Sequence, residues 1–206
     1  MYAIVTNNEI TKLINNPKAM VIGDVRYPAK IFQLWSKSEL NAIGIYEVVT
    51  NSANKKDEKW YINTNESYAF ADNQVTRSWG TATPKAHADS LYTSQDNTDD
   101  LIPDDKSVGD VKTRGLKYNL IKTLKEQVAN ELSKTDWYIT RNTEKETAIP
   151  SDISNHRDAV RTKQAEMETA ITNASDTPAL ETLYTYSEQD DGSVTRPLGE
   201  LPTLEI

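Results

Sequence analysis

The chain contains no cysteine, and this absence excludes several kinds of chemistry at once. Without thiols there are no disulfide bonds, no thiolate metal sites and no cysteine nucleophiles. Histidine is nearly as scarce, with two residues among 206. Small proteins that are secreted on their own often depend on disulfides, so the composition favours synthesis and folding in a cytoplasm.

Long apolar runs and an excess of positive charge are also missing. Nowhere do about 18 apolar residues follow one another, and Met1–Asn7 lacks the basic start of a signal peptide. The formal net charge is -8, and Lys and Arg are scattered among Asp and Glu. An acidic chain repels phosphate backbones. We therefore expect neither membrane insertion nor binding to nucleic acid.

A chain of this length is sufficient for one ordinary domain or two small ones. Residues 1–93 have the pattern of a β-rich module. Asn7-Asn8 separates two apolar segments, and asparagine tolerates the positive φ of tight hairpin turns. Ser36 and Glu39 have the spacing of a capping box, and Gly44 is suited to ending a helix. A short helix followed by a strand at Ile45–Thr50 is predicted.

Aromatic residues are concentrated in the second half of this module. The pattern predicts a meander of three strands, which begin near Trp60, Tyr68 and Val75, with a turn at Asp72-Asn73. The aromatic side chains are expected to pair across these strands and to form a core rather than a ligand platform.

The composition changes at residues 94–107, which are rich in aspartate and carry few apolar side chains. Acidic stretches of this kind repel themselves and stay extended, so a solvated linker is predicted. A calcium loop is the alternative, but the glycine and terminal glutamate of an EF-hand are missing.

Residues 108–186 have helical periodicity. One apolar stripe recurs every four residues from Leu116 to Leu132, and a second runs from Ile153 to Ile171 after a helix start at Pro150. The two stripes predict an antiparallel helical hairpin. Trp137 is expected to close the end of its core, and Asp136 is expected either to cap a local turn or to accept from Arg157 or Arg161. Residues 187–206 contain proline and glycine, and an extended tail is predicted.

The predicted fold class is therefore α+β. It comprises a small N-terminal antiparallel β-rich domain with a short helix, an acidic linker, a C-terminal α-helical hairpin and an extended tail.

No catalytic, cofactor-binding or metal-binding residues are predicted. His87 and His156 each have a hydroxyl and a carboxylate nearby in sequence, but a triad must be assembled in space with an oxyanion hole. Surface or capping roles are expected for both. We predict that the chain is not an enzyme. Glycan hydrolysis by two carboxylates stays open as a lesser alternative, because such a pair can meet from anywhere in a sequence.

Two stretches resemble proteins of tailed bacteriophages. The first is Tyr27-Pro28, Ile31-Phe32, Trp35-Ser36, Glu39-Leu40 and Ala42 to Tyr46, which resembles an N-terminal module of small proteins encoded among phage tail genes. The second is Thr135 to Tyr138, Arg141, Ile149-Pro150, Arg157 and Val160-Arg161. It resembles the helical module shared by phage tail-assembly chaperones and some tail-fibre or baseplate proteins.

This resemblance implies a structural protein of the phage tail that docks onto other tail proteins, as a fibre-associated, adaptor or baseplate component. It would be assembled in the host cytoplasm and retained in the virion. The resemblance is compatible with a homo-oligomer of this chain within the virion. The alternative is a tail or tail-fibre assembly chaperone that leaves. The β-rich module and the proline-containing tail favour the retained component. The candidate hairpin or partner-contact motif comprises Asp136, Trp137, Arg141, Pro150, Arg157 and Arg161.

Overall fold

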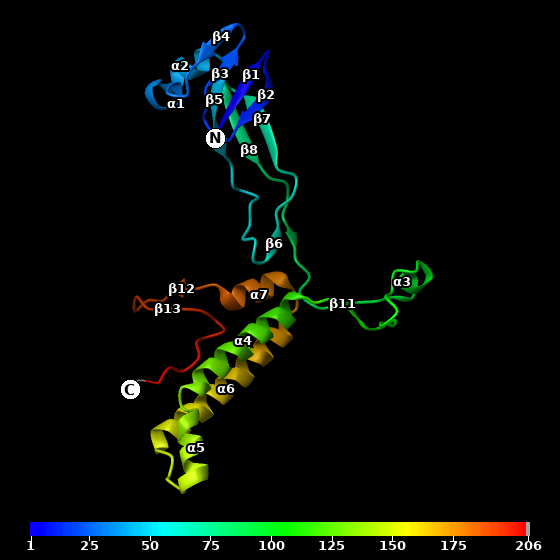
Figure 1. Cartoon of the computed structure of the whole chain (residues 1–206), viewed down its shortest axis with the longest axis vertical. Helices are drawn as coiled ribbons and strands as arrows, with labels where there is room; N and C mark the ends of the chain where they lie inside the picture. The colour runs from blue at the N-terminus through cyan, green and yellow to red at the C-terminus, as the bar shows by residue number, and fades with distance from the viewer. Residues whose placement is uncertain (205–206) are drawn as a thin grey trace. The chain divides into compact units, whose positions relative to one another are not determined.

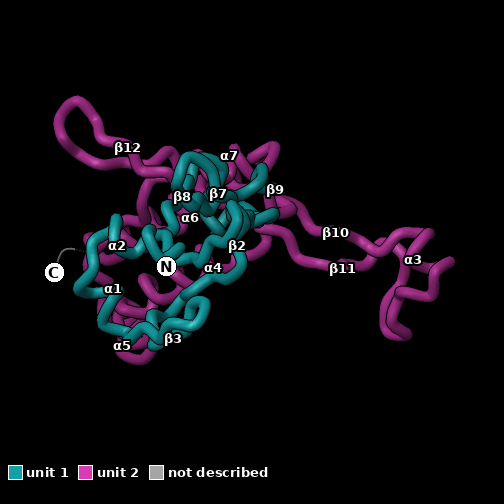
Figure 2. Tube along the Cα trace, turned by 90° about the horizontal axis from the view of Figure 1, so that it is seen from above, with its two compact units in different colours: residues 1–83 teal, residues 84–206 magenta. Residues whose placement is uncertain are grey.

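The computed structural model describes residues 1–204 and shows the predicted α+β fold, with a β-rich N-terminal sheet followed by C-terminal helices (Figure 1). The chain divides into two compact units, Met1–Thr83 and Pro84–Ile206, which Figure 2 colours separately. The division therefore falls before the predicted boundary at residue 93.

The first unit is built on a five-stranded sheet with the order β2-β1-β5-β8-β7. The predicted asparagine-containing turns are confirmed, since all four of their central residues have positive φ. The strands are β1 (Tyr2–Thr6), β2 (Glu9–Ile14), β5 (Ile45–Thr50), β7 (Ser67–Ala71) and β8 (Gln74–Ser78).

One strand pair departs from the predicted antiparallel arrangement. β5 and β8 are parallel, with Val48 opposite Val75, while the other pairs of this sheet are antiparallel. A parallel pair needs a long crossover connection. The segment from residue 51 to residue 73 supplies it, and its length was visible in the sequence while its path was not.

Short helices cover the core of this sheet. α1 (Ile31–Leu34) and α2 (Lys37–Ala42) bring Ile31 and Leu40 against Ile45 of β5. The capping box is confirmed, because Ser36 accepts from the Glu39 N–H and the Glu39 carboxylate accepts from the Ser36 N–H. Gly44 has a φ of 80°, and a Cβ there would lie 2.8 Å from the Val5 carbonyl oxygen. A hairpin of β3 (Met20–Ile22) and β4 (Val25–Tyr27) precedes these helices.

The aromatic meander is only partly correct. β6 (Tyr61–Ile62) pairs with β9 (Thr83–Pro84) instead of joining β7 and β8. Trp60 and Trp79 are buried as predicted. Phe70 packs against Tyr46 of β5, with 4.7 Å between ring centroids.

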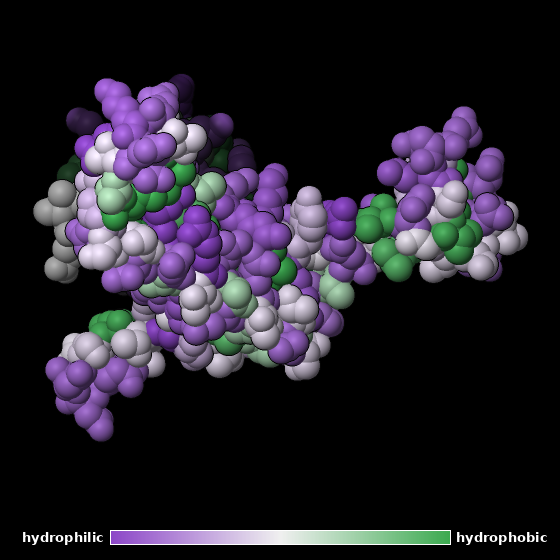
Figure 3. Space-filling model, turned by 90° about the horizontal axis from the view of Figure 1, so that it is seen from below, coloured by the Kyte–Doolittle hydropathy of each residue, from purple (hydrophilic) through white to green (hydrophobic). Residues whose placement is uncertain are grey.

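The acidic linker prediction is wrong. Residues 94–107 belong to an arm of the second unit, whose root is the antiparallel pair β10 (Ser90–Leu91) and β11 (Val111–Thr113) and which carries α3 (Ser94–Thr98). Within the arm, Asp96 accepts from Thr93 and pairs with Lys112. Figure 3 shows hydrophobic atoms on this arm among hydrophilic ones, and Leu101 is exposed there.

The predicted helical hairpin is present. α4 (Leu116–Ser133) and α6 (Ser151–Asn173) lie side by side and run in opposite directions (Figure 1). Each buries one apolar stripe, as the periodicity indicates. The buried apolar residues are Leu124 and Val128 of α4 and Ile153, Val160, Met167 and Ile171 of α6.

The second unit ends with more structure than an extended tail. After α7 (Thr177–Tyr184), a hairpin forms from β12 (Ser187–Glu188) and β13 (Val194–Thr195). Leu198 is buried, and its N–H donates to the Leu183 carbonyl at 3.0 Å. The extended-tail prediction is therefore wrong for this part, because Gly192 turns the chain and Leu198 anchors it. Residues 205–206 lie outside the described part.

None of the helices in the described part is long and apolar enough to span a membrane.

Candidate protein-docking surface

The turn between the two long helices is held by a buried arginine. Arg157 of α6 donates through Nη1 to the Leu132 carbonyl at 2.7 Å, the Thr135 hydroxyl at 2.7 Å and the Asp136 carboxylate at 2.9 Å. Thr135 is 1% exposed. The guanidinium satisfies a carbonyl in the last turn of α4, where helical partners run out. Arg157 thus ties α6 to the end of α4.

The same arginine fixes where the next helix begins. α5 (Asp136–Lys145) starts at the residue whose carboxylate binds Arg157. An acidic side chain in a first helical turn also interacts favourably with the helix dipole. The sequence predicted this contact but placed a simple turn where α5 stands, because the apolar periodicity stops at residue 132.

The remaining motif residues are spread apart. Arg161 is exposed and pairs with Asp158 at 3.2 Å, so it does not contact Asp136. Pro150 is the N-cap residue of α6, so the helix starts at Ser151, one position after the predicted start at Pro150. Asp136, Trp137 and Arg141 share α5, and Arg157 contacts only the first of them among the hydrogen bonds of this motif.

His156 is part of the same junction and was missed. The His156 side chain is 7% exposed, and Nε2 lies 3.2 Å from Oε1 of Glu131, so the predicted surface or capping role is wrong. The Lys134 ammonium lowers the pKa of Glu131, and His156 makes a smaller contribution in the same direction. His156 precedes Arg157 on the face of α6 that meets α4, and this face assignment requires the tertiary structure. His87 lies elsewhere, and its carbonyl accepts from the Lys117 N–H.

Trp137 does not close the hairpin core. It is 51% exposed, and no residue of α5 is fully buried. This prediction is wrong because α5 is a separate helix, and its first turn directs residue 137 outward while Thr135 takes the buried position.

The exposed aromatic ring is instead part of a stack. The ring centroids of Trp137 and Tyr138 are 3.7 Å apart, and the guanidinium carbon of Arg141 lies 4.9 Å from the Trp137 centroid. Residues four apart are neighbours on a helix surface, and a guanidinium over an indole face is favourable. The spacing of Trp137 and Arg141 was therefore a usable signal, given a helix there. We call Trp137, Tyr138 and Arg141 the α5 stack.

The α5 stack combines residue types that are enriched at protein–protein interfaces. Among the described residues, no group of His, Asp or Glu side chains is arranged to hold a metal ion. The stack offers an aromatic face, a cation and an exposed apolar neighbour, Ile139. Such residues contact other proteins through burial and stacking.

Comparisons of the chain with protein-family models, with curated proteins and with solved structures found no match.

Proposed function

We propose that the chain is a structural protein of a bacteriophage tail, a fibre-associated, adaptor or baseplate component that acts by docking onto neighbouring tail proteins. The observation that carries the docking role is the α5 stack, an exposed tryptophan, tyrosine and arginine on a helix anchored through buried Arg157. These three residue types dominate the energetics of protein–protein interfaces.

The anchoring matters because binding costs free energy whenever side chains must be ordered. Trp137, Tyr138 and Arg141 already hold one another in place, and Arg157 fixes the start of their helix. Because these side chains are already ordered, a partner that covers this surface loses little binding free energy to ordering them. Half of the Trp137 surface is still available for burial.

The assignment to a phage tail rests on the sequence resemblance of residues 27–46 and 135–161. The division into two compact units, with an arm and a terminal hairpin on the second, supports a protein with several contact surfaces. Other tail proteins are the proposed partners, and the virion is the proposed location. The proposal is also compatible with a homo-oligomer of this chain. We propose no enzymatic activity.

Mass spectrometry of purified particles of the phage that encodes this chain tests the proposal. A retained component should be present at a fixed copy number relative to the other tail proteins. An assembly chaperone should be abundant in infected cells and missing from purified particles. Release of sugar from host envelope polysaccharide by the purified chain would establish glycan hydrolysis and overturn the non-enzymatic role.

A pair of matched variants tests the α5 stack. Trp137→Ala should leave thermal unfolding nearly unchanged, because the side chain is half exposed, but should reduce incorporation into particles. Tyr186→Ala is the control, since Tyr186 is 52% exposed and also lies under an arginine, Arg196. Equal incorporation of both variants would contradict docking through the stack.

A further inference from the structure

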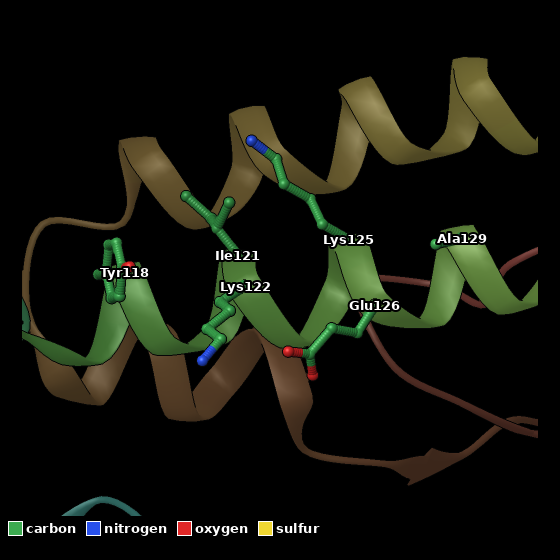
Figure 4. Close-up of a pocket in the computed structure, with 6 residues that line it drawn as sticks. All are labelled: Tyr118, Ile121, Lys122, Lys125, Glu126 and Ala129. Atoms are coloured by element: carbon green, nitrogen blue, oxygen red, sulfur yellow. The ribbon is translucent and has the colours of Figure 1, made fainter.

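A second surface feature of the helical unit is a groove on α4. A groove of about 510 Å³ runs along α4 (Figure 4), and the buried α4 residues Leu124 and Val128 are not among the residues that line it. All six described residues that line it belong to α4: Tyr118, Ile121, Lys122, Lys125, Glu126 and Ala129. We call this surface the α4 groove.

The lining combines apolar surface with positive charge. In Figure 4, Tyr118, Ile121 and Lys125 extend to one side of α4, while Lys122 and Glu126 extend to the other. Tyr118 is 43% exposed. Cations therefore stand on both sides of an apolar surface.

Neither the Lys122 nor the Lys125 ammonium forms a close ion pair with a described residue. Among the described residues Lys122 makes no ion pair, and the Nζ of Lys125 is 3.8 Å from Glu168, at the limit of such a contact. Exposed pairs at this distance contribute little to stability. Both ammonium groups are available to an incoming carboxylate.

The spacing of the lining residues is that of helix packing. Positions 118, 122, 125 and 129 follow one another at intervals of four, three and four, which keeps them on one face of a helix. The lining residues extend from Tyr118 to Ala129, so the groove covers about 18 Å of the length of α4. A hairpin of two helices buries one stripe of each, and the α4 groove is a second stripe, which no described residue outside α4 lines.

We propose that the α4 groove binds an amphipathic helix of a partner protein, one with apolar residues at three- and four-residue spacing flanked by acidic side chains. The apolar residues would cover Tyr118 and Ile121, and the carboxylates would pair with Lys122 and Lys125. This is recognition of a helix in a groove with charge complementarity along the rim.

A second copy of this chain is a poorer occupant. An antiparallel α4 centred on the groove brings Lys122 opposite Lys125 of its partner, and a parallel copy brings each lysine opposite itself. Like charges facing each other across an interface are unfavourable. Nucleic acid is disfavoured by Glu126 in the rim, by the apolar lining and by the net charge of -8. The inference does not depend on the proposed role in a phage tail.

Fluorescence polarisation with synthetic peptides tests the proposal on the full chain. The probe is a labelled helical peptide of about 18 residues, to match the length of α4, with leucines at three- and four-residue spacing and flanking glutamates. One comparison peptide carries lysine in place of each glutamate, and another has the acidic composition in scrambled order. The acidic amphipathic peptide should bind at least about tenfold more tightly than either comparison peptide.

Variants of the chain locate the binding. Lys122→Glu with Lys125→Glu should weaken binding of the acidic peptide at least about tenfold, as should Ile121→Ser. Lys145→Glu, a single lysine-to-glutamate change on α5, should leave binding unchanged. Circular dichroism checks folding, and if the double variant is misfolded, Lys122→Gln and Lys125→Gln are measured singly and should each weaken binding.

Three results would overturn the proposal. They are no binding of the acidic peptide, equal binding of all three peptides, and binding that is indifferent to Lys122 and Lys125. Tighter, lysine-dependent binding of a duplex DNA oligonucleotide would assign the groove to nucleic acid instead.

Discussion

Replacement of Arg157 by methionine should destabilise the helical unit substantially. The methionine keeps an apolar stem of similar length, so the change removes chiefly the guanidinium and its three hydrogen bonds at the end of α4. The Asp136 side chain is 61% exposed, so loss of its ion pair with Arg157 should cost less than about 1 kcal/mol.

The other two acceptors, the Leu132 carbonyl and the Thr135 hydroxyl, account for most of the expected loss of stability. A hydrogen bond to a charged group contributes about 1.5–3 kcal/mol. The Leu132 carbonyl, however, keeps the Thr135 N–H and hydroxyl as donors, so it is not left unsatisfied. We therefore take about 1 kcal/mol for each buried acceptor and expect a total loss of about 2–3 kcal/mol. For a unit of this size that corresponds to a fall in Tm of about 8–12 °C.

Thermal unfolding followed by far-ultraviolet circular dichroism measures this loss, because the long helices belong to the second unit. Arg161→Met is the matched control. Arg161 is 51% exposed and pairs with an exposed Asp158, so its replacement should change stability by less than about 0.5 kcal/mol. If the two variants melt within about 2 °C of each other, Arg157 does not hold the junction and the reasoning fails.

Three further predictions concern other parts of the chain. Lys112 and Thr93 lower the pKa of Asp96 to about 2, so its stabilisation of the arm is complete above the ordinary value of 3.8 and is lost as the pH falls through about 2. Amide signals of the arm in NMR spectra should shift over that range, and the same transition in an Asp96→Asn variant would contradict the assignment. Gly115→Ala should cost about 2 kcal/mol or more, because the new Cβ would lie 2.3 Å from the Ala88 carbonyl group. Unchanged melting of the helical signal would show that this contact relaxes freely. Ser36→Ala removes a helix cap and should cost about 1 kcal/mol, and tryptophan fluorescence, to which three tryptophans of the first unit contribute, should show the earlier unfolding. A melting point equal to that of the unaltered chain would mean that the cap is replaced by water.

The sequence alone determined the features that depend on neighbouring residues. The turns at Asn7-Asn8 and Asp72-Asn73 follow from the tolerance of asparagine and aspartate for positive φ. The capping box of Ser36 and Glu39 requires only a spacing of three. The paired apolar stripes of α4 and α6 repeat with the helical period, so the hairpin was readable as well.

The tertiary structure decided which faces of these elements are covered. The parallel pairing of β5 with β8 depends on the path of the intervening chain. The arm depends on the pairing of β10 with β11, the two strands that flank the acidic segment. Trp137 was expected in the core, and it is exposed because Arg157, from a helix 20 residues away in sequence, holds the preceding turn. Periodicity gives the stripes of a helix but not their partners, and for this reason neither the α5 stack nor the α4 groove could be located from the sequence.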